Sequence, residues 1–106
     1  MAFTAASLAD GQLASTKGTI YTSSSVKTVV KALTVFNTNA ADQTVSLYVK
    51  RSGSSSRQFF RAILAQNEFS YALSDGEVFV LSDGDVIEGD ATNATAVDYS
   101  IMGATE

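Results

Sequence analysis

Hydrophobic and polar residues alternate along most of this chain with the two-residue period of β-strands. Runs of this kind lie over residues 19–22, 28–37, 44–51, 57–64, 68–73, 78–81, 86–87 and 96–103. Successive side chains of a strand point to opposite faces, so each face of a run can be assigned from the alternation. No stretch has the period of an amphipathic helix. About eight short strands separated by turn signals predict an all-β, antiparallel two-sheet sandwich that is jelly-roll-like.

Turn signals are clearest in the stretch 73–89. It contains one phrase twice, Leu-Ser-Asp-Gly-Glu-Val at 73–78 and Leu-Ser-Asp-Gly-Asp-Val at 81–86. Each Asp-Gly pair favours a tight turn, because glycine reaches positive φ freely and aspartate can bond its own backbone. We therefore expect turns at 75–76 and at 83–84, each followed by a β-branched or aromatic run.

The two longest runs predict a hairpin in which Asn37 faces Gln43 across a loop over 38–42. In that register one face is aliphatic, and we assign it to the core: Leu33, Val35, Val45, Leu47 and Val49. The opposite face carries Val30, Ala32, Thr34, Phe36, Thr44, Ser46, Tyr48 and Lys50. Small hydroxyls around two aromatic rings suit a flat contact surface, and a solvent-facing polar row is the alternative.

Later runs extend the predicted core. Over 68–73 the alternation places Phe69, Tyr71 and Leu73 on one face, and over 96–103 it directs Val97, Tyr99 and Ile101 inward:. The run over 57–64 is apolar on both faces, which predicts a strand that is central in its sheet or covered by another chain.

The length of 106 residues corresponds to one domain:. Residues 1–17 are small and polar, with isolated apolar side chains, and predict an N-terminal arm without a partner in its own chain:. A frayed terminus is the alternative. The sandwich domain is expected over 18–106. The N-terminus has neither a basic segment nor a long apolar run, so we expect a soluble protein that is not exported and does not enter a membrane.

The chain contains no Cys, His, Trp or Pro. Without Cys or His there is no ordinary Ser-His or Cys-His nucleophile pair, so we expect no enzyme activity and no cofactor. The acids Asp83, Asp85, Glu88 and Asp90 do not have the spacing of a calcium-binding EF-hand loop. Turn formation and solubility explain them, and a structural cation shared between subunits stays open.

Charge is unevenly distributed along the chain. Residues 1–65 hold all seven bases and two acids, a balance of +5, whereas residues 66–106 hold nine acids and no base, a balance of −9, which together give −4. One interpretation is head-to-tail complementarity between copies, and the other is two solvated faces. Basic residues flank the tip at 52–56 next to Phe59 and Phe60, a pattern also seen in single-strand binding. The acidic pI near 4.6 argues against nucleic acid.

Several phrases together resemble small virion structural proteins of tailed bacteriophages. They are Val-Phe-Asn-Thr at 35–38, Val-Ser-Leu-Tyr-Val-Lys-Arg at 45–51, Leu-Ser-Asp-Gly-Asp-Val-Ile-Glu-Gly at 81–89 and Val-Asp-Tyr-Ser-Ile at 97–101. The resemblance implies a jelly-roll-like sandwich that decorates and stabilises the capsid by binding the major capsid protein. It also implies a place in the virion, after assembly in the host cytoplasm. A trimeric fibre, tail or head-spike module that binds a host receptor is the alternative.

A decoration protein needs self-association and a contact surface rather than a chemistry. We therefore expect a homotrimer, and we assign the interface to the polar-aromatic face and to two arginines near the tip. The assigned residues are Val30, Ala32, Thr34, Phe36, Tyr48, Arg57 and Arg61.

Overall fold

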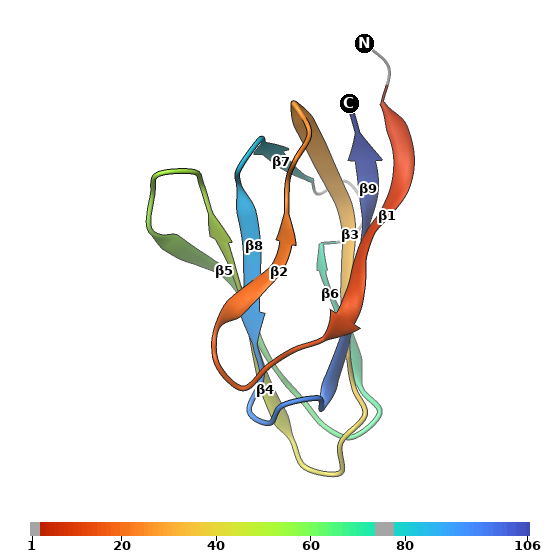
Figure 1. Ribbon diagram of the computed structural model, residues 1–106. Coiled ribbons are helices and arrows are strands. Elements are labelled where there is room, and N and C mark those ends of the chain that lie inside the picture. Colours follow the sequence, from red (N-terminus) through yellow and green to blue (C-terminus); the bar gives the residue numbers. More distant parts are fainter. Residues whose placement is uncertain (1–2, 74–77) are drawn as a thin grey trace.

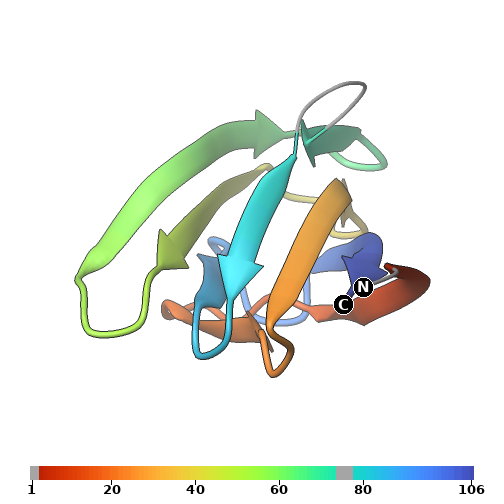
Figure 2. The same ribbon diagram turned by 90° about the horizontal axis from the view of Figure 1, so that it is seen from above.

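The computed structural model describes residues 3–73 and 78–106, and within them the chain forms β-strands and no helix. The strands are β1 (Thr4–Gln12), β2 (Gly18–Thr22), β3 (Lys27–Asn37), β4 (Gln43–Lys50), β5 (Ser56–Leu64), β6 (Phe69–Leu73), β7 (Phe79–Ser82), β8 (Val86–Asp90) and β9 (Val97–Thr105). They form two antiparallel sheets that face each other (Figures 1 and 2). The all-β sandwich predicted from the alternation is confirmed. No helix able to cross a membrane occurs among the described residues.

The strands are wound as nested pairs. One sheet, which we call the β3 sheet, has the order β1-β9-β3-β6, with β7 also paired to β3; the other, the β4 sheet, has the order β2-β8-β4-β5. The first strand thus pairs with the last, the second with the next to last, and β4 with β5 at the centre of the chain. This is the winding of a jelly roll, in which the chain folds as one long hairpin and then wraps into two sheets.

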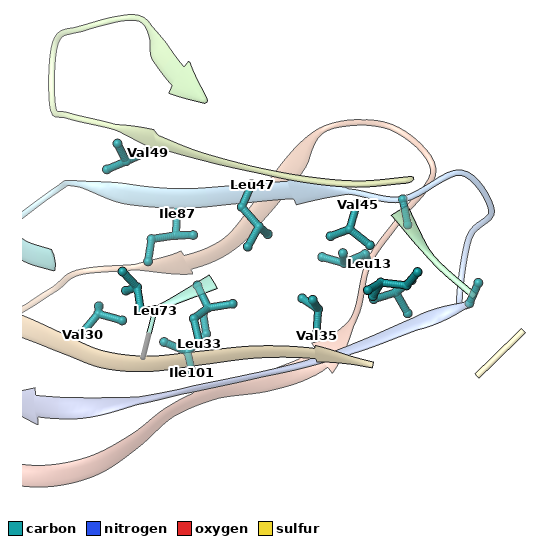
Figure 3. Close-up of a cluster of buried hydrophobic side chains, with 14 of the residues drawn as sticks. Leu13, Val30, Leu33, Val35, Val45, Leu47, Val49, Leu73, Ile87 and Ile101 are labelled. Carbon is teal, nitrogen blue, oxygen red and sulfur yellow. The ribbon is translucent and has the colours of Figure 1, made fainter. Parts of the chain in front are cut away.

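Nested winding overturns the predicted pairing of β3 with β4. β3 and β4 do not form a hairpin, because the loop over 38–42 carries the chain from one sheet to the other. The predicted core face is nevertheless correct. Leu33 and Val35 on β3 point at Val45 and Leu47 on β4 across the gap between the sheets, and all four side chains are fully buried (Figure 3). The apolar faces of β3 and β4, predicted to lie side by side in one sheet, therefore face each other from two sheets.

Two inner strands added late in the sequence contribute further core residues. Val97 and Ile101 on β9 are fully buried and Tyr99 packs against the core, as the alternation predicts, and Ile87 on β8 is fully buried as well. Because β8 lies between β2 and β4 and β9 lies between β1 and β3, the C-terminal third of the chain completes both sheets.

The segment predicted as a separate N-terminal arm contains an integral strand. β1 pairs with β9 from Thr4 opposite Thr105 to Gln12 opposite Asp98, so residues 4–12 of the predicted arm do have a partner in their own chain. Leu13, just after β1, is buried, and its backbone N–H bonds to the carbonyl of Val97. The sequence conceals this strand because β1 lies at a sheet edge and needs few large apolar residues.

β-Bulges change which side chains point inward. In the β3–β9 pair the register shifts between Val30 and Ala32, so Val30 turns into the core and is fully buried instead of lying on a contact face. In the β3–β6 pair a second shift places Leu73 inward but Tyr71 outward. The prediction that these two side chains share a face with Phe69 is therefore wrong for Leu73, because one extra residue inverts the alternation.

Hydrogen-bonded polar side chains hold the connections at both ends of the sandwich. At one end the buried amide of Asn37 donates to the carbonyls of Ala41 and Leu64, and Gln43 exchanges two hydrogen bonds with Asn93. At the other end the predicted turn at 83–84 joins β7 to β8 with Gly84 at a φ of 90°. The predicted turn at 75–76 lies outside the described residues.

Candidate interaction surfaces

The residues assigned to an interface from the sequence do not share one surface. Ala32, Thr34 and Phe36 lie on the outer side of the β3 sheet, whereas Tyr48 and Arg61 belong to the β4 sheet on the opposite side of the molecule. Arg57 lies on β5, at the edge of that second sheet. The predicted surface is divided because it assumed that β3 and β4 are neighbours, and Val30 is removed from it by the bulge.

A patch of large apolar side chains nevertheless lies on the outer side of the β3 sheet. Its residues, which we call the apolar face, are Phe36, Phe69, Tyr71, Val80 and Met102, exposed by 37, 59, 55, 45 and 52%. They come from four strands, and the register places them in neighbouring rows: Phe36 opposite Phe69, Thr34 opposite Tyr71, and Ala32 opposite Met102. The other exposed large apolar residues among those described are Phe3, Val26, Ile63 and Val78, of which Ile63 belongs to the β4 sheet.

A shallow groove opens at one end of the apolar face. It has a volume of about 270 Å³ and is lined by Thr34, Val35, Phe36, Phe69, Asp98, Tyr99 and Ser100. The rings of Phe69 and Tyr71 meet edge to face, with centroids 5.6 Å apart. The groove is apolar at its base and polar along one side, so it suits an apolar group that carries a hydrogen-bond donor.

The polar side of this groove is built from β1 and β9. The Ser100 hydroxyl donates to Asp10 over 2.7 Å, and the Gln12 amide donates to Asp98 over 3.0 Å. Burial, and then the charge of Asp10, raise the pKa of Tyr99, whose ring lies beneath this row. Tyr99 therefore stays a neutral hydroxyl near neutral pH and packs against Gly11 rather than exchanging protons.

Sequence reasoning found only part of the apolar face. It placed Phe36 there and put Phe69 and Tyr71 on a common face without deciding whether that face points inward, and it did not consider Met102 or Val80. The alternation of Phe69, Ser70 and Tyr71 is real, yet an alternation does not say which of its two faces is buried. The available signal is the short length of this run, which is typical of an edge strand with one wet face.

The acidic residues after the second Asp-Gly turn do not form a cluster. Asp85 is buried and lies at the base of the β7–β8 turn, Glu88 accepts a hydrogen bond from Ser56, and Asp90 accepts one from the Tyr48 hydroxyl over 3.2 Å. Nowhere in residues 3–73 and 78–106 do three such side chains gather in a way that could hold a metal ion. Asp90 instead links β8 to β4, Glu88 links β8 to β5, and Asp85 links the β7–β8 turn to the residue two positions after β4.

Asp85 fastens three connections at one end of the sandwich. One carboxylate oxygen accepts from the Ser52 N–H at 2.9 Å, and the other accepts from the Ser82 N–H at 2.9 Å and from Arg51 Nη1 at 3.1 Å. The Ser52 hydrogen bond is the main cause that lowers the pKa of Asp85; burial opposes it, and the bonds from Ser82 and Arg51 add to the lowering. The ionised carboxylate is therefore the form that the fold requires.

Replacing Asp85 with asparagine should destabilise the protein at neutral pH and flatten its acid response. The asparagine amide carries N–H hydrogens, and where these meet the Ser82 N–H and Arg51 Nη1 two donors face each other. We expect this mismatch to lower the free energy of unfolding by about 1.5–3 kcal/mol at pH 7. Because the folded pKa lies below the ordinary value of 3.8, the stabilisation by Asp85 is complete above that value and is lost as the pH falls through the folded pKa:. Urea unfolding at pH 7 and pH 3 measures both effects. Asp83→Asn, at an exposed neighbour, is the control, and an acid response of Asp85→Asn equal to that of the wild type would contradict this role.

Basic side chains gather on the β4–β5 hairpin, whose loop stands away from the rest of the molecule (Figures 1 and 2). We call Lys50, Arg51, Arg57 and Arg61 the basic hairpin. Arg51 is engaged by Asp85 and by the carbonyl of Val80, whereas Arg57 and Arg61 are exposed and make no ion pair with any described residue. β5 is an edge strand rather than a central one, so the predicted covering by another chain stays open.

The aromatic rings of the basic hairpin are occupied within the chain. The ring of Phe59 meets Phe79 on the other sheet edge to face at 4.5 Å, and Phe60 packs against the core. Stacking platforms for single-stranded nucleic acid need exposed rings beside the basic groups. This arrangement does not provide them.

Charges that are separated along the sequence are mixed in space. The acidic strands β8 and β9 lie between strands of the basic part, namely β2 and β4 in one sheet and β1 and β3 in the other. The Arg51–Asp85 ion pair, at 3.1 Å, joins the two parts directly. Among the described residues, the basic and acidic parts of the sequence are therefore interleaved instead of forming two separate halves, and charge has to be considered surface by surface.

No protein family, no curated protein and no solved structure matches the chain. The jelly-roll topology, the apolar face and the basic hairpin are therefore the observations from which its function is argued.

Proposed function

We propose that this chain is a structural protein of a tailed-bacteriophage virion that acts by association, most simply as a capsid decoration protein bound to the major capsid protein. The observation that carries the proposal is the apolar face, whose rings and Met102 are about half exposed on a small, well-packed sandwich. Contiguous exposed patches of this kind mark interaction sites. The resemblance to phage structural proteins suggests where such contacts are made, namely in the virion, which is assembled in the host cytoplasm.

Two further features support an assembly role. The jelly roll is a fold that viral capsid proteins use, although lectins use it too and a fold alone does not define a function. The carboxylates with hydrogen-bond partners, Asp85, Glu88 and Asp90 among them, serve the fold itself. A non-enzymatic role without a cofactor therefore remains our proposal. The homotrimer expected from the sequence stays a prediction, since the structure contains a single chain.

We propose that the basic hairpin is the surface that attaches to the capsid shell. Arg57 and Arg61 are exposed on a projecting edge of the β4 sheet, which does not carry the apolar face. Reversing both charges, as Arg57→Glu with Arg61→Glu, should lower capsid occupancy and leave the melting temperature nearly unchanged. Each exposed ion pair contributes only about 0–1 kcal/mol, so reversing both arginines should lower capsid occupancy more than reversing either one alone.

The experiment is co-sedimentation of the purified protein with shells of its source phage that lack it, over a salt series. Arg57→Lys with Arg61→Lys keeps the charge and is the matched control. Occupancy should fall as salt rises to about 1 M, where screening acts within roughly 3 Å. Constant occupancy across the series, or equal binding by the reversed variant, would refute an electrostatic contact, and no binding by any form would refute decoration.

A receptor-binding module of a fibre, tail or head spike is the second candidate, and the groove beside Phe36 and Phe69 favours it. Its apolar base and its hydrogen-bonding row, Asp98 and Ser100, resemble the mixed surfaces that hold a sugar or a peptide side chain:. Binding of the protein to host cells, abolished by Phe69→Ala and unaffected by the charge reversals in the basic hairpin, would favour this candidate over decoration.

A further inference from the structure

We infer that the apolar face is a self-association surface, on which a second copy of this chain packs its own apolar face with the strands antiparallel. The inference deepens the proposed function by naming a partner for that face, and it rests on the proposal that the chain acts by association. It does not depend on the capsid, because the basic hairpin is a separate surface. Two properties of the face, its charge and its shape, argue for a second copy.

Opposite charges lie at opposite ends of the apolar face. Asp98 is in register with Phe36 at one end, and Asp10 lies beside it in register with Ser100. Lys27 begins β3 at the other end, next to Glu106, whose N–H bonds to the Lys27 carbonyl. Lys31 lies at the bulge between the two ends, so the two lysines share their end of the face with one carboxylate. From Lys27 to Phe36 the strand extends roughly 30 Å, at about 3.3 Å per residue.

None of these four charges is neutralised by an ion pair within residues 3–73 and 78–106. Asp10 and Asp98 accept hydrogen bonds only from the neutral side chains of Ser100 and Gln12. Turning a second copy end for end about an axis across the strands brings the lysine end of each face over the carboxylate end of the other. One surface thus complements itself, which is what a two-fold contact requires.

Large and small side chains are also divided between the two ends of the face. The bulky rings of Phe36, Phe69 and Tyr71 occupy the carboxylate end. The lysine end carries smaller side chains: Val29 in register with Val80 and with Ala104. The end-for-end arrangement places the rings of each copy over the small side chains of the other, so two twisted sheets can approach to about 10 Å, the normal separation of packed sheets.

The area of the face sets the expected strength of this contact. The four neighbouring strands of the β3 sheet, about 4.8 Å apart and about 30 Å long, present roughly 500–600 Å²:. Stable interfaces begin at about 600 Å² per partner. We therefore expect a reversible pair that forms at micromolar concentrations. A contact of this symmetry closes at two copies, so it predicts a dimer where the sequence alone suggested a trimer.

Sedimentation velocity on the full chain from about 1 to 500 µM tests the pairing. The wild type should shift from monomer to dimer across the series. Phe69→Ser with Tyr71→Ser should weaken the dimer by at least about tenfold, because it removes central apolar contacts. Ile63→Ser is the matched control: Ile63 is 61% exposed but belongs to the β4 sheet, so its replacement should leave the dimer unchanged. Thermal melting verifies that each variant is folded.

A charge-exchange pair makes the test specific for the end-for-end arrangement. Lys27→Glu with Lys31→Glu places carboxylates at both ends of the face, and Asp10→Lys with Asp98→Lys places lysines at both ends. Each variant alone should be monomeric at concentrations where the wild type is dimeric, and an equimolar mixture should form a one-to-one heterodimer. A wild type that stays monomeric to 500 µM, a trimer, or a mixture that stays monomeric would overturn the inference. Reduced capsid binding by the basic-hairpin variants with an intact dimer would leave it standing, so the two proposals fail separately.

Discussion

Gly103→Ala should be among the most damaging single substitutions in this protein, although it adds only one methyl group. A Cβ at this position would lie 1.9 Å from the carbonyl oxygen of Val29 and 3.1 Å from the Cα of Val30. Both are backbone atoms of β3, at the bulge that turns Val30 into the core. The neighbouring strand cannot yield as a flexible side chain could, so relief requires separation of β9 from β3. We expect a loss of about 3 kcal/mol or more, at the top of the range for overpacking.

Gly18→Ala is the control for this substitution. The nearest atom to a Cβ at Gly18 is the carbonyl oxygen of Thr16, 3.9 Å away, so space is available. We expect its free energy of unfolding to lie within about 1 kcal/mol of the wild type, because reduced freedom of the unfolded chain offsets small losses. Equilibrium denaturation in urea measures both variants. Equal stability of Gly103→Ala and Gly18→Ala would show that β3 and β9 are not packed as closely as described.

Leu47→Ala should cost most of the stability of this domain. Leu47 is fully buried in the middle of the β4 sheet and points at β3 across the core (Figure 3). Its register partner on β8 is Gly89, which has no side chain that could move into the space. The cavity should therefore persist, and we expect the upper half of the range of about 2–5 kcal/mol found for such truncations.

Small domains have total stabilities toward the lower end of about 5–15 kcal/mol, so the Leu47→Ala variant should be largely unfolded on mild heating. Ile63→Ala, on the adjacent strand β5, removes a side chain that is 61% exposed and should change the stability by no more than about 0.5 kcal/mol:. Thermal and urea unfolding compare the two. Similar losses in both variants would mean that the inward and outward assignments in the β4 sheet are wrong.

The alternation of side chains was sufficient to predict every described strand except β1 and about half of the core. Leu33, Val35, Val45, Leu47 and Val49 were assigned inward from the two-residue period alone, and all of them are buried. This property is local, because a side chain and its second neighbour share a face whatever strand lies beside them. The turn at 83–84 was predictable for the same reason, since Asp and Gly determine it within the turn itself.

The candidate surface required the tertiary structure. The apolar face combines side chains from β3, β6, β7 and β9, and nothing in any one strand shows which strands will be neighbours. Leu73 points inward whereas Phe69 and Tyr71 lie outside, because a single extra residue between Tyr71 and Leu73 inverts the alternation. Such a bulge is decided by the fit of β6 against β3:.

What the sequence by itself determined is therefore every described strand except β1, the inward side of most of β3, β4 and β9, and one of the turns, all of which depend on residues a few positions apart. Only the tertiary structure decided that β3 and β4 belong to different sheets, that residues 4–12 pair with β9, and that acidic and basic strands lie side by side. The physical reason is that nested winding brings together residues as far apart as Thr4 and Thr105, and the free energy of those contacts depends on both partners at once:.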